Sequence, residues 1–215
     1  MSAQTRTGIA ASAAAATATL ALAALAWVVA LERMSGMDMG VATQLGSFAS
    51  FLAAWAAMMA AMMLPGALPA VVRRANGDGH PFGAPFFALS YLAVWTLVGV
   101  LVYGLDKPHS SATAGLPTIA AGIYELTPLK RECRRRCREE VRSGACFGIN
   151  CVGSSIGLMA ILAALGVMNI AWMAVITVVI VAQKLVPPRA AIDVPLAFAV
   201  IGLGLLVVVA PQSIL

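Results

Sequence analysis

Charged residues are scarce in this chain of 215 residues, because Asp, Glu, Lys and Arg together make up only 11% of it. A soluble domain carries about a quarter of its residues as charged side chains. Histidine occurs twice, and there is no P-loop, no Gly-rich dinucleotide fingerprint, no haem-attachment motif and no Ser-His-Asp set. The low content of charged residues excludes a soluble globular protein. The missing motifs argue against an enzyme.

Apolar residues dominate what remains: they make up 61% of the chain, and the mean hydropathy is +0.91. A membrane-spanning helix needs about 20 mostly apolar residues, and no stretch alternates as a barrel strand does. We therefore predict an all-α, polytopic transmembrane bundle of about seven spans, forming a single domain over residues 1–215. The predicted spans are 8–31, 45–72, 85–105, 112–129, 146–168, 170–186 and 194–210.

The first span has some features of a signal peptide, since Arg6 precedes it and it is rich in Ala. Its apolar run is longer than the roughly 7–15 residues of a signal-peptide core. We expect a retained anchor, with cleavage after an Ala as the alternative.

Lysine and arginine fall almost entirely at the N-terminus and on every second loop, and only Arg33 and Lys107 lie on the opposite side. The positive-inside rule then puts the N-terminus in the cytoplasm and the C-terminus outside. A multi-pass protein of the bacterial inner membrane is expected. Within the basic cytoplasmic loop 130–144, residues 130–142 should form a short helix along anionic inner-leaflet lipid, with an ion pair between Glu132 and Arg136. This lipid contact accounts for the net charge of +5, so nucleic-acid binding is not expected.

Methionine is frequent and clustered, with 11 residues in the chain. Three of them lie close together in the first outside loop: Met34, Met37 and Met39. Packing gains little in such a polar loop, whereas thioethers are soft ligands that suit Cu(I). We therefore predict a copper site there, which His109 of the next outside loop could join if it is not simply solvated. Met58 and Met62 of the second span are further candidates, with gap filling in the core as the alternative.

The four cysteines are predicted on or near the cytoplasmic side, where free thiols rather than disulfides are expected. Cys133 and Cys137 are four residues apart, so a helix would put both sulfurs on one face. Cys146 and Cys151 follow at the start of the fifth span, and apolar packing is the alternative for both. The nearby Arg side chains favour the thiolate, which is the metal ligand. Cys133, Cys137 and Cys151 complete the predicted metal-binding set.

Two ionisable residues lie near the inner ends of spans, Glu125 and Lys184. Such groups pair or line a polar path, or their side chains extend to the interface. The two interpretations are equal for Glu125, and extension to the interface is favoured for Lys184. Pro65 and Pro69 are expected to bend or end the second span.

Three stretches, 55–65, 124–130 and 166–173, resemble those of a bacterial family of predicted metal-binding integral membrane proteins. The resemblance runs from about residue 55 to residue 187, and it implies a metal role without naming the metal or a reaction. Cys133, Cys137 and Cys151 match the family pattern. The chain departs from it where the family has a His, a Cys pair and an acid: at Arg136, at Ser154 and Ser155, and at Gln183.

Three function classes follow. The outside thioethers and inside thiols favour handling of a soft metal, with copper as the expected ion, by a transporter or membrane chaperone. The lost ligands, sparse charge and small extramembrane mass favour a non-catalytic accessory subunit of a larger membrane enzyme complex. A redox-linked membrane enzyme is the third, and the lack of an acid–base set or haem ligands argues against it. A larger complex or a homo-oligomer is left open.

Overall fold

The computed structural model describes residues 3–34, 47–77, 82–105, 115–140, 142–165, 170–186 and 190–209. In these ranges the chain is helical and contains no strand. The helices are α1 (Ala3–Met34), α2 (Phe48–Gly77), α3 (Gly83–Leu105), α4 (Gly115–Glu125), α5 (Pro128–Glu139), α6 (Gly144–Leu165), α7 (Ile170–Leu185) and α8 (Ala190–Val209). The predicted all-α bundle is therefore confirmed.

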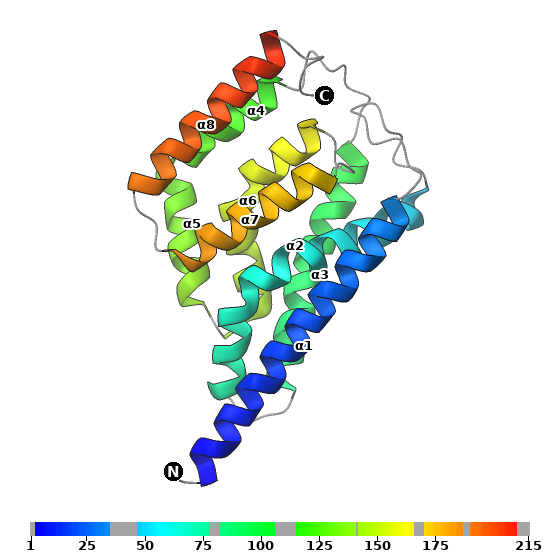
Figure 1. Ribbon diagram of the computed structural model, residues 1–215, viewed down its shortest axis with the longest axis vertical. Helices are drawn as coiled ribbons and strands as arrows, with labels where there is room; N and C mark the ends of the chain where they lie inside the picture. The colour runs from blue at the N-terminus through cyan, green and yellow to red at the C-terminus, as the bar shows by residue number, and fades with distance from the viewer. Residues whose placement is uncertain are drawn as a thin grey trace.

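Successive long helices run in opposite directions through the molecule (Figure 1). The helix α2 lies at its centre, since it packs against α1, α3 and α7. The helix α6 packs against α3, α4 and α5, and α8 packs against α4. Four helices, α2, α5, α6 and α7, therefore surround the region where the cysteines of α5 and α6 lie.

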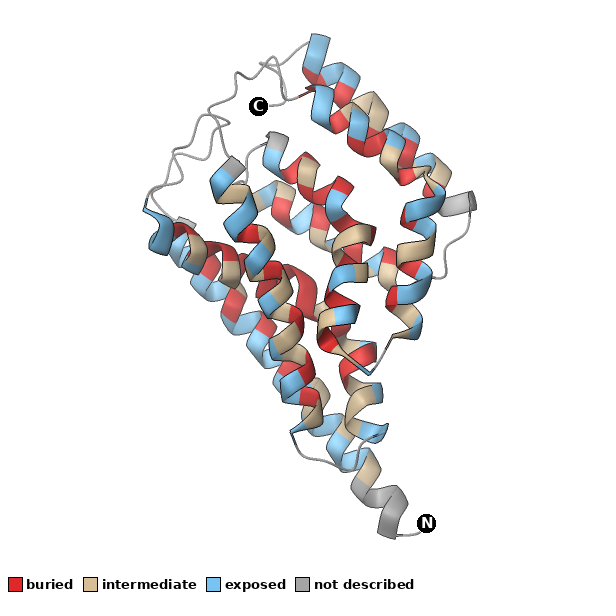
Figure 2. Cartoon of the chain, turned by 180° about the vertical axis from the view of Figure 1, so that it is seen from behind, coloured by how far each residue is buried: buried red, intermediate tan, exposed pale blue. Residues whose placement is uncertain are grey.

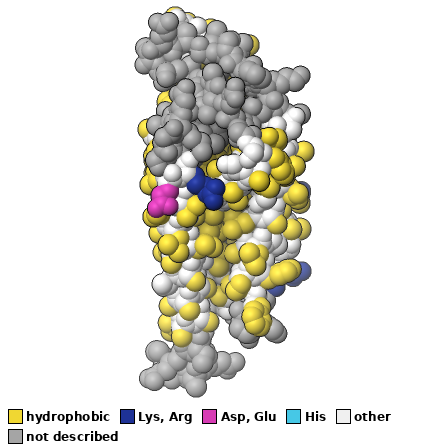
Figure 3. Space-filling model, turned by 90° about the vertical axis from the view of Figure 1, so that its right-hand side faces the viewer, with side chains coloured by type: hydrophobic (Ala, Val, Ile, Leu, Met, Phe, Trp, Pro, Cys, Tyr) yellow, Lys and Arg dark blue, Asp and Glu magenta, His cyan; other side chains and the backbone are white. Residues whose placement is uncertain are grey.

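Four segments are long and apolar enough to cross a membrane: Gly8–Arg33, Phe48–Gly77, Gly83–Gly104 and Gly144–Ala163. The apolar parts of α7 and α8 are shorter, at Ile170–Leu185 and Asp193–Val209. Large apolar side chains such as Leu97 and Leu101 point outward, and hydrophobic side chains cover much of the described surface in Figure 3. This surface suits lipid, as expected of a membrane protein. The count of seven spans and the orientation stay predictions.

The predicted fourth span, 112–129, is not one helix. The helix α4 covers only 11 residues and ends at Glu125, and a turn then carries the chain into α5. At about 1.5 Å per residue, α4 is much shorter than the hydrocarbon core of a bilayer. The cause is Pro128, which disfavours helical backbone at the residue before it; Thr127 is accordingly extended, with φ −71° and ψ 146°.

The four methionines of α2 are buried in the protein core rather than exposed to lipid: Met58, Met59, Met62 and Met63. Figure 2 shows the buried residues where the helices face one another. Pro65 and Pro69 lie inside α2, which continues to Gly77. Of the two expectations, that these prolines bend or end the helix, the second is therefore wrong. The C-terminal half of α2 lies beside α5, where Arg73 donates to the Arg138 backbone oxygen.

The predicted helix in the basic loop is confirmed as α5, and so is its ion pair, with Arg136 Nε 2.7 Å from Glu132 Oε1. Hydrogen bonds from Arg135 and Arg136 lower the pKa of Glu132 to about 2. The expectation that the basic residues of this loop all face lipid headgroups is wrong for Lys130 and Arg134. Both are buried against the bundle, so α5 is a docked part of the fold.

Candidate functional site

The start of α5 is fixed by its own sequence. The Thr127 hydroxyl accepts a hydrogen bond from the backbone N–H of Lys130 at 3.3 Å, and Pro128 occupies the first turn. Both are favourable at a helix N-terminus, where backbone N–H groups otherwise lack partners. This start sets the rotation of α5, so that Lys130, Arg134 and Cys137 face the bundle together.

Lys130 makes a buried ion pair with Glu125 at the end of α4, and the two side chains are only 2% and 1% exposed. The Gln183 side chain of α7 donates to the same carboxylate at 3.0 Å. Burial lowers the pKa of Lys130, and the charge of Glu125 opposes that shift. Of the two predicted roles for Glu125, pairing is therefore the one observed.

Arg134 makes the second buried ion pair, with Asp193 of α8. Its guanidinium also donates to the backbone oxygens of Gln183 at 2.5 Å and Val186 at 3.1 Å. Because breaking a buried pair leaves an uncompensated charge, Arg134 fixes α5 to the end of α7 and the beginning of α8.

The next inward residue of α5 is Cys137, and it meets a thiol from another helix. The Cys137 thiol lies close enough to the thiol of Cys151 on α6 for the two to interact, and its sulfur lies 3.9 Å from the backbone oxygen of Phe147. The hydroxyl of Tyr91, on α3, lies 3.2 Å from Cys151 Sγ. Cys151 is fully buried and Cys137 is 5% exposed. Two free thiols from separate helices thus form a buried pair.

Lys184 of α7 completes the surroundings of this thiol pair. Its ammonium donates to the Tyr91 hydroxyl at 3.2 Å and interacts with the nearby Cys151. It also lies 5.5 Å from the centre of the Tyr91 ring and 5.7 Å from that of Phe147, a favourable position for a cation. Lys184 therefore turns inward, and the favoured expectation that it extends to the membrane interface is wrong.

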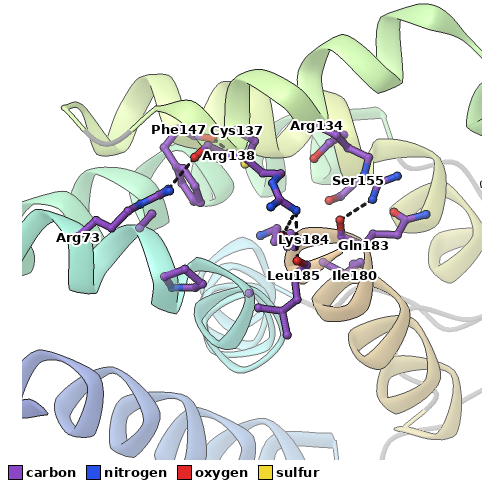
Figure 4. Close-up of a pocket in the computed structure, with 14 residues that line it drawn as sticks. Arg73, Arg134, Cys137, Arg138, Phe147, Ser155, Ile180, Gln183, Lys184 and Leu185 are labelled. Carbon is purple, nitrogen blue, oxygen red and sulfur yellow. Dashed lines mark hydrogen bonds between the residues drawn. The ribbon is translucent and has the colours of Figure 1, made fainter. Parts of the chain in front are cut away.

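A cavity of about 110 Å³ lies beside the thiol pair, between α2, α5, α6 and α7 (Figure 4). Cys137, Ser154 and Ser155 contribute to its wall, as do Gln183 and Lys184. Arg73 and Arg138 lie on the same wall, and Arg73 donates to the backbone oxygen of Arg138 at 2.7 Å. The cavity gives a small ligand access to the Cys137 sulfur.

The comparison with known families addresses the chemistry of this region. A family model described as copper chaperone, PpoB2, matches residues 52–207. The chain belongs to this copper chaperone family. No curated protein and no solved structure matches the chain. The family match spans α2 to α8 and so includes the thiol pair and the whole cavity, and it supports the predicted copper-related role.

The other predicted ligands of this copper chaperone family member lie apart from the thiol pair or outside the described residues. Cys133 is half-buried, and its sulfur packs on Gly153, where an added Cβ would lie 2.6 Å from it. Met58 and Met62 are core residues of α2. Met37, Met39 and His109 lie outside the described residues, and the side chain of Met34 does too. Within the described ranges, no three His, Cys, Asp or Glu side chains could hold a metal ion together.

Sequence reasoning missed Tyr91 and Phe147. A tyrosine within an apolar span is a usable signal, because a buried hydroxyl needs a hydrogen-bond partner. Its ring packs edge-on against Phe147 at 5.1 Å between centroids. Nothing in the spacing of the chain, however, brings residue 91 to residue 151.

Proposed function

We propose that this chain is a membrane copper chaperone or transporter that holds Cu(I) between the sulfurs of Cys137 and Cys151. The observation that carries the proposal is that these two buried thiols, from α5 and α6, lie close enough to interact, with Cys137 on the wall of the cavity. Thiolates are the protein ligands that select Cu(I), and this ion accepts coordination by only two of them. A site with two thiols is therefore sufficient.

The proton of Cys137 must leave when copper binds. The neighbouring Cys151 and burial both raise the pKa of Cys137, so this thiol keeps its proton in the empty site. Metal ligation needs the thiolate and so releases protons. Copper loading should therefore become tighter as the pH rises.

The remaining predicted ligands suggest how copper crosses the protein. In the proposed orientation the N-terminus and the cavity face the cytoplasm of a bacterial cell. Met34, Met37, Met39 and His109 would then lie outside, and Met58 and Met62 between the two sides. Cys133, on the same helix as Cys137, is a candidate for the exchange of copper between the thiol pair and a partner. Thioethers outside and thiols inside form an order of increasing affinity for Cu(I).

Copper binding by the purified full chain tests the proposed site. The detergent-solubilised protein competes for Cu(I) with a chromophoric Cu(I) chelator under reducing conditions, and the affinity is compared among single cysteine variants. Cys137→Ser and Cys151→Ser should each weaken binding by at least about tenfold, since each removes one of two ligands. Cys146→Ser is the matched control, because Cys146 is on the same helix as Cys151 but is exposed.

If Cys137→Ser and Cys151→Ser both bind Cu(I) as tightly as the wild type, the site is elsewhere and the proposal is wrong. Folding is checked by helical circular dichroism and by elution as a single species.

An accessory subunit of a larger membrane enzyme complex is the second candidate. The lack of a third His, Cys, Asp or Glu ligand in the described ranges favours it. The two functions differ on gentle purification without chelators: a chaperone should elute alone with bound copper, whereas a subunit should elute with large partners and without copper of its own.

A further inference from the structure

The charges around the cavity are of one sign. Four basic side chains contribute to its wall: Arg73, Arg134, Arg138 and Lys184. Among the described residues that line it there is no Asp or Glu. Arg134 is neutralised by its buried pair with Asp193, which leaves three cations to account for.

These three cations donate their hydrogen bonds to neutral groups. Arg73 donates to the Arg138 backbone oxygen at 2.7 Å, and Arg138 to the Leu185 backbone oxygen at 3.2 Å. Lys184 donates to the Tyr91 hydroxyl at 3.2 Å. These contacts hold the side chains in place without cancelling their charges. A concave site lined by one sign of charge concentrates ions of the other sign.

On its open side the cavity therefore favours an anionic form of copper over the cuprous cation. We infer that copper reaches Cys137 and Cys151 as an anionic Cu(I) complex of small thiols that carry carboxylates; this inference rests on the proposed function. Such a bis-thiolate complex carries a negative charge at the metal and more on its carboxylates. The guanidinium groups of Arg73 and Arg138 present paired donors that suit carboxylates.

The exchange balances without any other reactant. The two bonds between copper and the incoming thiolates break, and two bonds to the sulfurs of Cys137 and Cys151 form. Each proton that the protein thiols carry passes to a departing thiolate, which then leaves as a neutral thiol. Copper stays Cu(I), and the negative charge of the complex passes to the protein site beside Lys184. No oxidant, reductant or external base is needed.

The test compares two donors of Cu(I) to the purified full chain: the glutathione complex, which carries carboxylates, and the complex of the neutral thiol 2-mercaptoethanol. The transfer rate from each is measured at low and high salt. Wild type should load faster from the glutathione complex, with a rate that falls as salt rises. With the glutathione complex, the double variant Arg73→Gln with Arg138→Gln should load about tenfold more slowly than wild type. With the 2-mercaptoethanol complex, which carries no carboxylates, its rate should fall far less.

Two further variants make the result specific. Arg131→Gln changes the same charge on an exposed position of α5 that does not line the cavity, and it should load like wild type. Arg73→Lys with Arg138→Lys keeps the charge and should recover most of the rate, which separates the effect of charge from a folding defect.

Equal rates from both donors in wild type would overturn the inference, and so would a double Gln variant that loads normally from glutathione. A double variant that also loses equilibrium affinity for Cu(I) supplied by the 2-mercaptoethanol complex would overturn it too, because the arginines would then shape the metal site itself. None of these results would restore copper binding to Cys137→Ser or Cys151→Ser, so failure of the inference is distinct from failure of the proposed site.

Discussion

Gly66 of α2 lies directly against the side chain of Lys184 of α7. A Cβ at position 66 would stand 2.6 Å from Lys184 Cδ and 3.3 Å from its Nζ. Glycine inside a helix costs about 1 kcal/mol relative to alanine, so this position disfavours the helix while it leaves room for Lys184. That room lets the ammonium group reach Tyr91 and Cys151.

Gly66→Ala should push the Lys184 side chain away from the thiol pair. Because groups around a metal ligand tune its affinity, we expect Cu(I) binding to weaken by about tenfold, while the propensity of α2 for helix improves. Competition with a Cu(I) chelator measures the affinity, and thermal unfolding in detergent measures the stability.

Gly77→Ala is the matched control for Gly66→Ala. It makes the same change on the same helix, where an added Cβ meets nothing within 4 Å, and should bind Cu(I) normally. Unchanged affinity in Gly66→Ala would mean that Lys184 contributes nothing to the site.

Tyr91→Phe removes a single oxygen atom, the one that lies 3.2 Å from Cys151 Sγ and accepts from Lys184. The ring and its packing on Phe147 are retained. Loss of this partner of a metal ligand should weaken Cu(I) binding by about tenfold, as measured by the same competition.

Tyr124→Phe serves as the comparison for Tyr91→Phe. It removes a hydroxyl that donates to the Gly153 backbone oxygen at 2.6 Å. The structure describes no contact between this hydroxyl and the thiol pair. It should lower stability without lowering copper affinity. Equal copper affinities for the two variants would remove Tyr91 from the site.

Asp193→Asn should destabilise the protein by about 3 kcal/mol, because it leaves the buried guanidinium of Arg134 without its counter-charge. The loss should appear as a lower midpoint in thermal unfolding of the purified protein. Glu132→Gln removes an equivalent charge from the exposed face of α5 and should shift the midpoint far less. Similar shifts for the two variants would contradict the role of the Arg134–Asp193 pair in docking α5.

The helices and the copper-related role can be predicted from the sequence much better than the residues of the candidate site. Hydropathy over stretches of 20 or so residues predicts the long helices, and the spacing of Glu132 and Arg136 predicts α5. The pairing of Cys137 was missed. The spacing of Cys133 and Cys137 suggested a site within one helix, whereas the rotation of α5 turns Cys137 toward Cys151 of α6.

The rotation of α5 about its own axis could not be predicted from the pattern of apolar residues along it. The inward face of α5 is formed by Lys130, Arg134 and Cys137, so two of its three buried residues are charged. Their partners Glu125 and Asp193 lie on α4 and α8, and only the assembled fold brings them to α5. Lys184 was misjudged for the same reason: a lysine near the end of a span usually extends to the interface, unless a neighbouring helix offers it an inward path, as Gly66 does.

The methionine cluster of the first predicted outside loop is tested by replacing Met34, Met37 and Met39 together by Leu, which keeps bulk and removes sulfur. If the loop collects Cu(I), the variant should lose its binding there and show weaker copper-dependent growth. The thiol pair should still bind copper in the purified variant. Unchanged growth and an unchanged number of bound copper ions would show that the loop is not a site.

The orientation is best tested at Cys146, because it is the exposed cysteine at the start of α6 whereas Cys137 is buried. In a variant in which Cys133, Cys137 and Cys151 are changed to Ser, a membrane-impermeant maleimide should label Cys146 in inverted vesicles and leave it unlabelled in intact cells. The positive-inside rule predicts this outcome, since the loop before α6 carries the largest group of basic residues. A further change of Cys146 to Ser must abolish the signal. Labelling in intact cells would put the cavity outside, reverse the proposed order of thioethers and thiols, and leave the thiol pair to receive copper from the opposite side.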